Sequence, residues 1–584
     1  MQDMQDMNHM HDTNDMRYKL IAPFAQGSTT VHKTGQWSGR RPAYLEKLSP
    51  CREACPAGAD IPVALWMASE GYFDEGLKTI LQENPLPGIC GRVCYHPCQS
   101  NCNRIEFDAA VEIRSMERAL ADYGSATPTK KRADHPKRIA VAGSGPAGLS
   151  AAYFLSRLGH EVTIFEARKE PGGVLRYGIP DYRLPKSIVK KEIARILSLG
   201  VSLRTGVSVD GHIFNRLREE YDAVFLSTGA WNPRRLDLAT DGCSNVLYGL
   251  DFLSNPRRRA VCEDKESVVV VGGGDVAVDV ARTARRLCDA GAKITMVAPE
   301  KPGSFPAIPE GLKHAAEEGI EMIGGYRPVR FVAGEGGARL EFTRTIVEKN
   351  PATGLYSMVD AGGEEMLLQP DIVIVAIGQV PHVASYPSNL FAGDGDNVYV
   401  NELGVTPSPN VYAGGDLIRQ RPAVVDAIAS GKRAAIAMDM EAQGLEKDLR
   451  ALELGGGLSL SAQAYMEGAS PIDLKRVVRL DELNTLLYRK SEPHSPQYRR
   501  PAARIQSFSE VSRGLNKEKA VEEAKRCFSC GRCVGCDLCF LLCPDMSISR
   551  KAKKEYTIVS DYCKGCSICA TTCPRHVIEM GESR

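Results

Sequence analysis

The cysteines of this chain show the clearest chemical pattern. Of its 19 cysteines, 16 gather near the two ends of the sequence. Two runs near the C-terminus share the spacing C-x2-C-x2-C-x3-C-P, in which three cysteines of one run and the last cysteine of the other bind one 4Fe–4S cluster. Zinc instead favours two separated pairs. The predicted ligand sets are Cys533, Cys536, Cys539 and Cys573 for one cluster, and Cys543, Cys563, Cys566 and Cys569 for the other.

Further cysteines stand outside these two runs. Cys527 and Cys530 form a C-x2-C pair just before the first run, and six more lie near the N-terminus: Cys51, Cys55, Cys90, Cys94, Cys98 and Cys102. Six thiolates are too many for one four-ligand cluster and too few for two. The spacing leaves open whether Cys527 and Cys530 bind a cluster, stay unliganded or form a redox-active pair. Cys243, Cys262 and Cys288 lie singly, and we expect them to be packing residues.

A glycine-rich turn begins the central part of the chain. RIAVAGSGPAGLSAAYFLSRLGHEVTIFEA predicts a strand, a turn, a helix and a second strand that ends at Glu166. The G-x-G-x-x-G spacing allows a tight turn, backbone approach to a pyrophosphate and close packing of the helix on the strand. The helix N-terminus favours an anion, and the acid is placed to accept from a ribose hydroxyl. The turn residues expected to bind the dinucleotide are Gly143, Ser144, Gly145, Pro146, Ala147 and Gly148.

A second unit of the same kind follows in SVVVVGGGDVAVDVARTARRLCDAGAKITMVAPEK, where Gly272, Gly274, Asp275 and Ala277 occupy the turn. Two dinucleotide units predict two carriers, and a flavin with a nicotinamide is the economical pair for hydride chemistry. Three segments, GGVLRYGIP, STGA and VYAGGDLIRQRPAVVDAIASGKRAA, belong with the first unit, so we assign FAD to it and the nicotinamide to the inserted second unit. A helix starting near Ala423 would point its positive end at the flavin's pyrimidine edge. The further FAD residues are Gly173, Leu175, Thr228, Gly229, Gly415, Asp416, Ala423 and Val424.

From about Pro50 to Ala437 the chain resembles the small subunit of glutamate synthase and its relatives, which include the amino-terminal part of dihydropyrimidine dehydrogenase. GSGPAGLSAAYFL, GGVLRYGIPDYRLPK, GGGDVAVDVART, AIGQVP and AGGD occur in the family's order. That family carries an EA-x-R-C-x2-C segment just before P-C-x3-C-P, whereas here the preceding residues have no cysteine and EEAKRCFSC appears near the other end. The resemblance therefore implies one N-terminal cluster on Cys51, Cys102, Cys527 and Cys530.

The resemblance also implies a second N-terminal cluster on Cys55, Cys94, Cys98 and a helix acid that aligns with Glu117. Cys90 is the competing fourth ligand, because thiolate suits iron–sulfur clusters better than carboxylate.

The nicotinamide preference rests on the residues after the second unit's last strand. NADPH-using family members carry arginines there, whereas VAPEK places Pro299 and Glu300. A carboxylate repels a 2′-phosphate and accepts from a free 2′-hydroxyl, which favours NAD(H) over NADP(H). The adjacent Lys301 and a solvated loop role for Glu300 are the opposing considerations. Gly378 of AIGQVP completes the expected NAD site.

These motifs predict an α/β fold. It consists of two nested Rossmann-like dinucleotide-binding domains, an N-terminal helical iron–sulfur domain and a C-terminal α+β two-cluster ferredoxin domain. The predicted parts are a disordered tail (1–40), the helical iron–sulfur domain (41–130), the FAD domain (136–260 and 371–445), the NAD(H) domain (261–370), a connector (446–526) and the ferredoxin-like domain (527–584).

Composition limits the functional classes. The 584 residues carry a formal net charge of +1, so no basic field indicates nucleic acid. No apolar run is long enough for a membrane span, and no export signal is found, so we expect a cytoplasmic protein.

No hydrolytic constellation stands out, and we assign no catalytic side chain, because hydride transfer would occur at the FAD. We expect an electron-transfer flavoprotein subunit that connects NAD(H), FAD and four 4Fe–4S clusters to a catalytic partner. Candidate partners are a thiamine-diphosphate 2-oxoacid or aryl-glyoxylate oxidoreductase, a tungsten aldehyde oxidoreductase and a ring-reducing enzyme. Alternatives are the glutamate synthase small subunit, a flavin-based electron-bifurcating NAD(P)H:ferredoxin oxidoreductase subunit and a scaffold with vestigial sites.

Overall fold

The computed structural model describes most of the chain. The described residues are 33, 35, 38–131, 134–236, 238, 245–255, 257–334, 337–349, 356–363, 365–383, 386–390, 397–445, 452–454, 459–468, 472–552 and 555–582. Nearly all of the tail predicted for residues 1–40 lies outside them, as do Cys243 and the first residues of the predicted connector. The chain forms two compact units. The smaller contains residues up to Ala43, Asp537–Thr572 and residues from Ile578, and the larger contains Tyr44–Cys536 and Cys573–Val577.

The larger unit begins with a group of short helices, which we call the helical domain. Its elements are β2 (Glu46–Leu48), α1 (Pro50–Ala54), α2 (Ile61–Ser69), α3 (Phe73–Leu81), α4 (Pro87–Val93), α5 (Pro97–Ser100), η5 (Asn103–Glu106) and α6 (Ile113–Tyr123). Ser49 caps α1, and Pro50 occupies its first turn, where a missing N–H costs nothing. Gly71 has φ +84°, so the helix-like stretch VALWMASEGYFDEGLKTILQ breaks into α2 and α3.

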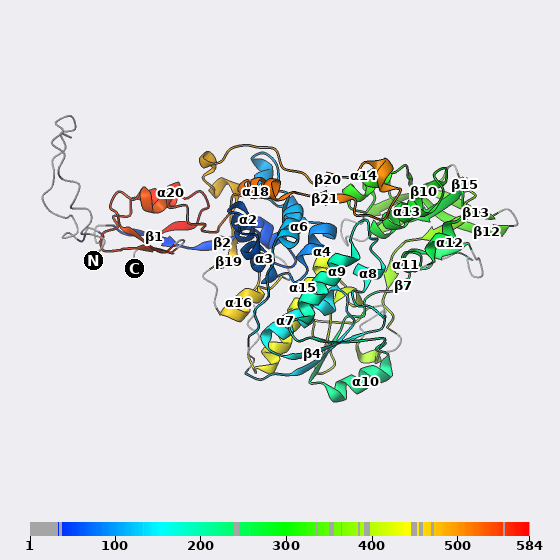
Figure 1. Cartoon of the computed structure of the whole chain (residues 1–584), viewed down its shortest axis with the longest axis horizontal. Helices are drawn as coiled ribbons and strands as arrows, with labels where there is room; N and C mark the ends of the chain where they lie inside the picture. The colour runs from blue at the N-terminus through cyan, green and yellow to red at the C-terminus, as the bar shows by residue number, and fades with distance from the viewer. Residues whose placement is uncertain are drawn as a thin grey trace. The chain divides into compact units, whose positions relative to one another are not determined.

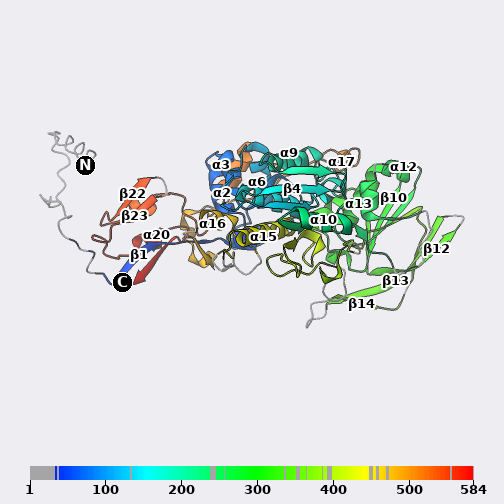
Figure 2. The same cartoon turned by 90° about the horizontal axis from the view of Figure 1, so that it is seen from below.

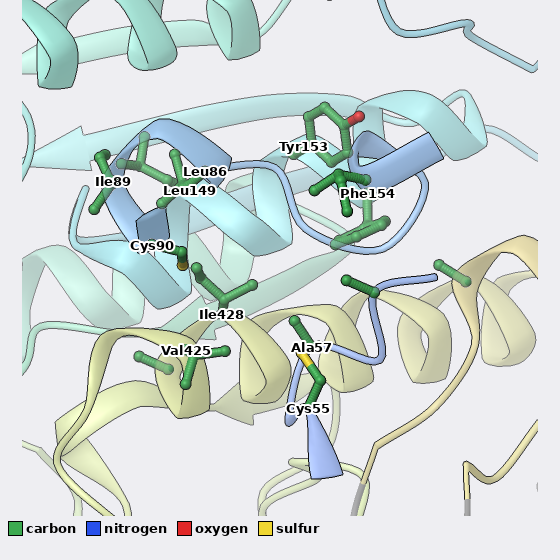
Figure 3. Close-up of a cluster of buried hydrophobic side chains, with 14 of the residues drawn as sticks. Cys55, Ala57, Leu86, Ile89, Cys90, Leu149, Tyr153, Phe154, Val425 and Ile428 are labelled. Carbon is green, nitrogen blue, oxygen red and sulfur yellow. The ribbon is translucent and has the colours of Figure 1, made fainter. Parts of the chain in front are cut away.

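The first dinucleotide unit forms a parallel sheet in the order β18-β6-β3-β4-β5. Its elements are β3 (Arg138–Ala142), α7 (Pro146–Leu158), β4 (Glu161–Glu166), α8 (Val174–Tyr177), α9 (Lys186–Leu197), β5 (Ser202–Thr205), α10 (Gly211–Glu220), β6 (Ala223–Leu226), β18 (Val411–Ala413), η8 (Gly415–Leu417) and α15 (Val424–Ala442). The predicted strand–turn–helix–strand is therefore present. Apolar residues of β3, β4, α7, α15 and the helical domain share one core, part of which is drawn in Figure 3.

The second dinucleotide unit forms another parallel sheet, in the order β11-β10-β9-β16-β8. Its elements are β8 (Val246–Tyr248), α11 (Gly249–Ser254), α12 (Arg258–Cys262), β9 (Ser267–Val271), α13 (Asp275–Leu287), β10 (Lys293–Ala298), η6 (Pro302–Ser304), α14 (Pro309–Glu317), β11 (Glu321–Gly324) and β16 (Ile372–Val375). Figures 1 and 2 both show α13 beside β10. Cys262 and Cys288 are buried in this sheet's core, as expected of packing residues.

An antiparallel sheet follows β11, and the sequence reading did not anticipate it. It comprises β12 (Tyr326–Gly334), β13 (Gly337–Lys349), β14 (Tyr356–Asp360) and β15 (Met366–Leu368). Phe331, Leu340 and Phe342 bury their side chains against the parallel sheet. Figure 2 shows β12, β13 and β14 extending beyond β10. Alternating burial along paired strands is typical of an antiparallel sheet. The sequence pattern predicts alternating strands and crossover helices throughout this part of the chain, so this sheet was not predicted.

The connector returns to the helical domain within the larger unit. Its elements are α16 (Ala462–Glu467), β19 (Ile472–Val477), η10 (Leu480–Glu482), η11 (Thr485–Leu487), β20 (Gln497–Tyr498), α17 (Pro501–Arg504), β21 (Ser512–Gly514) and α18 (Lys517–Lys525). β19 pairs with β2 in parallel, and Asn516 caps α18. The connector therefore brings Cys527 and Cys530 back to the helical domain.

The smaller unit has its own short elements. They are β1 (Arg40–Tyr44), α19 (Leu538–Leu541), β22 (Ile548–Ala552), β23 (Glu555–Ile558), α20 (Ile568–Thr572) and β24 (Ile578–Glu582). β22 and β23 form an antiparallel hairpin, and β1 pairs with β24. In the described part of the chain no helix combines the length and the apolar character needed to cross a bilayer.

Candidate functional site

A cavity of about 420 Å³ lies against the first glycine-rich turn. Of the predicted FAD residues, the lining contains Gly143, Ser144, Gly145, Pro146, Ala147, Glu166, Gly173, Thr228, Gly229, Gly415, Asp416, Ala423 and Val424. Gly148 and Leu175 do not line it. A Cβ on Gly148 would lie 2.0 Å from the Gly143 carbonyl oxygen, so this glycine serves the packing of α7 on the turn.

The turn leaves room for a ligand's phosphates. Gly143 has φ +99°, and a Cβ there would come within 2.5 Å of the Ser227 carbonyl oxygen. By contrast, a Cβ on Gly145 would meet nothing within 4 Å, so the space above this glycine is open. Gly145 is the N-cap of α7, and the helix therefore points its amide groups at that open space. This geometry fits a pyrophosphate.

Three acids, Glu166, Asp210 and Asp416, line the cavity, and two of them were predicted to bind FAD. Glu166 accepts hydrogen bonds from the backbone amides of Ser144 (3.0 Å) and Arg168 (2.8 Å), and from the Ser144 hydroxyl. Burial, with a smaller contribution from Asp426, raises the pKa of Asp416 to about 6. Glu166 therefore stabilises the first glycine-rich turn through these hydrogen bonds.

The second glycine-rich turn repeats this geometry. Gly272 has φ +136°, and a Cβ there would lie 2.3 Å from the Ala376 carbonyl oxygen, whereas Gly274 at the N-cap of α13 faces open space. Ala277 is fully buried in the core, which accounts for a small residue at the third position. Asp275 Oδ1 accepts from the Ile308 amide at 3.0 Å. Glu300 follows the end of β10, and Gly378 has φ +113°.

Five predicted or competing ligands surround one cavity in the helical domain, which we call cavity A. They are Cys55, Cys90, Cys94, Cys98 and Glu117. Burial raises the pKa of Glu117 to about 8, although Asn84 Nδ2 donates a hydrogen bond to its Oε1 at 2.7 Å. Burial likewise raises the pKa of the Cys90 thiol, and Glu117 adds to this. Glu117 and Cys90 thus both face cavity A, and the choice between them stays open.

Four other cysteines surround a second cavity, which we call cavity B: Cys51, Cys102, Cys527 and Cys530. Phe528 anchors the Cys527–Cys530 segment, because its ring contacts Phe107 (5.4 Å between centroids) and Tyr488 (4.5 Å). Burial, followed by the neighbouring thiols of Cys102 and Cys527, raises the pKa of Cys51. These four thiols come from segments far apart in the sequence and line one cavity. Such a set fits a group that is bound by thiolates.

Cavities A and B suit a cluster better than a single ion. Within the described residues, no three His, Cys, Asp or Glu side chains are grouped so as to hold one metal ion. A cube presents several separate iron atoms, so its ligands need not converge on one point. In the smaller unit, Cys543, Cys563, Cys566 and Cys569 line a cavity of the same kind. Cys533, Cys536, Cys539 and Cys573 are divided between the two units, and their shared cluster stays a prediction.

Comparison with known proteins agrees with these two kinds of site. Residues 137–431 match the family model described as pyridine nucleotide-disulphide oxidoreductase, which is half of the chain. The chain belongs to this family. Residues 44–129 match a second model, described as dihydropyrimidine dehydrogenase domain II, 4Fe–4S cluster. The family assignment and the α/β fold class are thus confirmed: an NAD(P)H-dependent oxidoreductase with a flavin and nucleotide domain and a 4Fe–4S domain.

Curated relatives cover most of the chain. The beta subunit of an NADP(+)-dependent formate dehydrogenase from Moorella thermoacetica is 33% identical over 83% of this chain and 71% of its own length. The beta subunit of an NADPH-Fe(3+) oxidoreductase from Geobacter sulfurreducens is 30% identical over 84% and 77%. The PreT subunit of the NAD-dependent dihydropyrimidine dehydrogenase of Escherichia coli K12 is 33% identical over 67% and 90%. Among solved structures, Mycobacterium tuberculosis FprA with NADPH has a TM-score of 0.46 and 20% identity over 53% of this chain and 86% of its own.

The flavin cavity of this family member also has lining residues that sequence reasoning missed. Arg168 lies between two aromatic rings, 4.4 Å from the centroid of Tyr177 and 4.3 Å from that of Trp231. Arg168 and Trp231 both line the cavity. Their positions, two residues beyond Glu166 and directly after STGA, were the available signals. Such a stacked guanidinium suits a phosphate or an aromatic ring.

A buried charge network connects α15 to the helical domain. Lys432 Nζ donates to Glu83 Oε2 and to the Ala57 carbonyl, both at 2.7 Å, and Lys432 and Glu83 are fully buried. Arg52 pairs with Asp60 at 3.1 Å, and Arg532 reaches the same carboxylate at 3.0 Å. Removing one member would leave an uncompensated buried charge, so the network fixes how α15 packs against the helical domain beside cavity A.

The cavities are neighbours through shared or adjacent residues. Val424 lines the flavin cavity, and the next residue, Val425, lines cavity A. Ile61, Leu65 and Ile113 line both cavity A and cavity B. Figure 3 shows Val425 on α15 in the same view as Cys55 and Cys90. The flavin cavity, cavity A and cavity B therefore follow one another through the larger unit.

Proposed function

We propose that this chain is an electron-transfer subunit that connects NAD(H), through FAD and four 4Fe–4S clusters, to a catalytic partner subunit. FAD accepts two electrons as a hydride and releases them singly, and iron–sulfur clusters carry single electrons. The family and its relatives' subunit names support the general reaction. The number of clusters, the choice of nicotinamide and the partner are the parts that we propose.

The succession of cavities supports this proposal most directly. Val424 and Val425 bring the flavin cavity and cavity A to one turn of α15, and three apolar side chains separate cavity A from cavity B. Lys432 and Glu83 fix α15 against the helical domain in this arrangement. Apolar walls also exclude water, which protects reduced carriers from side reactions. A chain that only bound nucleotides would need neither cysteine-lined cavity.

The proposed ligands of the cavity A cluster are Cys55, Cys94, Cys98 and Glu117, and those of the cavity B cluster are Cys51, Cys102, Cys527 and Cys530. Glu117 is proposed over Cys90 because the resembled family carries its fourth ligand on the following helix, and Glu117 of α6 faces cavity A. The two C-terminal clusters keep the ligands that their spacing predicts.

The proposed nicotinamide is NAD(H). Glu300 follows β10, where its carboxylate would accept from a free 2′-hydroxyl and repel a 2′-phosphate. The relatives' names divide on this point, since two refer to NADP(H) and one to NAD. The preference therefore depends on the residues of this chain.

The proposed partner is a catalytic subunit that makes or uses low-potential electrons, such as a thiamine-diphosphate 2-oxoacid oxidoreductase. The name of the first relative indicates that a similar beta subunit belongs to a formate dehydrogenase, which is a second class of catalytic partner. A glutamate synthase small subunit is less favoured, because in the resembled family that subunit normally ends after the flavin domain, whereas this chain continues into the C-terminal cysteine runs.

The test is anaerobic preparation followed by stepwise reduction. We expect about sixteen irons per FAD from four cubes, bleaching of flavin absorbance by NADH faster than by NADPH, and then reduction of the clusters. In Cys94→Ser, flavin bleaching by NADH should persist while cluster reduction slows. Cys288→Ser, a buried cysteine in the NAD(H) domain, is the matched control and should behave as the wild type. Absence of inorganic sulfide, or no flavin response to either nucleotide, would refute the proposal.

A further inference from the structure

Arg114 connects cavity A to the nicotinamide domain. This residue lies on α6 and lines cavity A, where its side chain is 14% exposed. Cys94 and Cys98 line the same cavity. The positive charge of Arg114 therefore lies beside predicted cluster ligands.

The partner of this arginine belongs to another domain. Arg114 forms an ion pair with Glu310, the second residue of α14 in the NAD(H) domain. The Tyr498 hydroxyl, from the connector, donates to the other Glu310 oxygen at 2.7 Å. Glu310 is therefore held in a defined place, and its negative charge compensates that of Arg114 beside cavity A.

The start of α14 is also bound to the second glycine-rich turn. The Ala307 amide donates to the Gly273 carbonyl at 3.1 Å, and the Ile308 amide donates to Asp275 Oδ1 at 3.0 Å. α14 begins at the next residue, Pro309. A ligand that displaces the Gly272–Asp275 turn therefore also displaces Glu310 relative to Arg114.

We propose that the Arg114–Glu310 pair sets the reduction potential of the cavity A cluster according to whether the nicotinamide turn holds a nucleotide. This inference rests on the proposed function, because it requires a cluster in cavity A. Reduction adds negative charge to a cluster, so a nearby cation favours the reduced form and a carboxylate beside that cation weakens the effect. Both are positioning residues, because they act through charge and do not carry the electrons.

The first experiment is an EPR-monitored redox titration of the anaerobic holoprotein. The cavity A signal is defined as the one lost in Cys94→Ser. Arg114→Gln should lower the potential of this signal, Glu310→Gln should raise it, and Arg114→Lys should stay near the wild type. We expect about a tenfold change in the ratio of reduced to oxidised cluster at a fixed ambient potential, which is about 59 mV for a one-electron couple.

The matched control is Glu317→Gln. Glu317 lies on the same helix and pairs with Arg504 at 2.6 Å, but it does not line cavity A. It should leave the potential unchanged. Shifts of opposite sign in Arg114→Gln and Glu310→Gln are the decisive signature, because general loosening of the interface would move both variants in the same direction.

The second experiment adds ADP-ribose, which has the ribose–pyrophosphate part of the nucleotide but cannot transfer a hydride. Saturating ADP-ribose should shift the potential of the cavity A signal in the wild type and in Glu317→Gln, and should not shift it in Arg114→Gln or Glu310→Gln. Equal ADP-ribose shifts in all four proteins would overturn the inference, and so would no shift in the wild type.

The outcomes separate this inference from the proposed function. If Cys94→Ser loses no signal, cavity A holds no cluster and the proposed function fails with it. If the signal is present but the two variants do not shift it in opposite directions, only this inference fails. If Arg114→Gln loses iron, the test depends on Glu310→Gln alone. In that case, a cavity A potential that is unchanged or lowered in Glu310→Gln overturns the inference.

Discussion

Glu166 shows how one side chain can serve both the fold and the ligand site. Its two oxygens accept from Ser144 and Arg168, so the carboxylate holds the turn on one side and lines the flavin cavity on the other. A hydrogen bond to a charged group contributes about 1.5–3 kcal/mol. Glu166 therefore also stabilises the glycine-rich turn at which we expect the pyrophosphate to bind.

Replacing this acid should loosen flavin binding. In Glu166→Ala, the turn loses its charged acceptor and we expect FAD affinity to fall about 30-fold, equivalent to about 2 kcal/mol. Equilibrium dialysis of released flavin measures this. Glu161→Gln, exposed at the other end of β4, is the control and should keep wild-type affinity. Equal flavin affinity in Glu166→Ala and the wild type would contradict the dual role.

His314 predicts a pH dependence of stability. Burial, followed by the neighbouring Arg282, lowers its pKa to about 4. A histidine with a lowered pKa contributes stability above its unfolded pKa of about 6.5, and this contribution is lost as the pH falls towards 4. At pH 5 the loss attributable to His314 should be about 2 kcal/mol relative to pH 7.

Calorimetry at pH 7 and pH 5 measures this loss as a decrease in the unfolding temperature. His314→Gln should show a smaller decrease than the wild type. His212→Gln, exposed on α10, should show the wild-type decrease. If His314→Gln and the wild type lose the same stability, another group is responsible.

At the scale of elements, the contact between α7 and α15 positions the flavin cavity. Gly431 makes this contact possible, because a Cβ there would lie 2.2 Å from the Ala147 carbonyl oxygen. Since α15 also presents Val424 and Val425 to two cavities, a small displacement of this helix would move both walls. Close helix packing is thus a condition for the arrangement of the redox sites.

Two glycine-to-alanine variants should have opposite effects. Gly431→Ala forces α15 away from α7, so we expect a loss of about 1–3 kcal/mol in stability and weaker flavin retention. Gly311→Ala in α14 places its Cβ 3.5 Å from Val278 and near no other atom, so helix propensity should make it neutral or stabilising by up to about 1 kcal/mol. Thermal unfolding of both variants tests this, and equal effects would contradict the packing argument.

At the scale of the whole molecule, cavity B joins segments from opposite ends of the larger unit. Asn103 Nδ2 contacts Cys530 Sγ at 3.5 Å, and Arg526 donates to the Ala109 carbonyl at 2.8 Å. These contacts hold residues after α18 against residues between α5 and α6. A cluster in cavity B would therefore link the segment after α18 to the helical domain.

Removing the late pair should cost one cluster. We expect the double variant Cys527→Ser/Cys530→Ser to lose about four irons while the signals of the two C-terminal clusters remain. Iron analysis and low-temperature EPR measure this, with Cys262→Ser as a buried control that should keep all its iron. Loss of the C-terminal cluster signals instead would discredit the assignment of Cys527 and Cys530 to cavity B.

The sequence by itself determined the features that depend only on residues close together along the chain. Both strand–turn–helix–strand units appear where the glycine spacing predicts them, because each turn, helix and strand lies within one short segment. The α/β class follows for the same reason. The antiparallel sheet of β12–β15 was missed, since alternating burial there competed with a pattern of crossover helices.

Only the tertiary structure decided which distant residues meet. Spacing could not say that Val425 lines cavity A or that Arg114 pairs with Glu310. The meeting of Cys51 with Cys530 was implied by the family resemblance and not by spacing. The physical reason is that backbone periodicity and glycine conformations act over a few residues. Contacts between separate elements instead depend on how whole helices and sheets bury their apolar faces together.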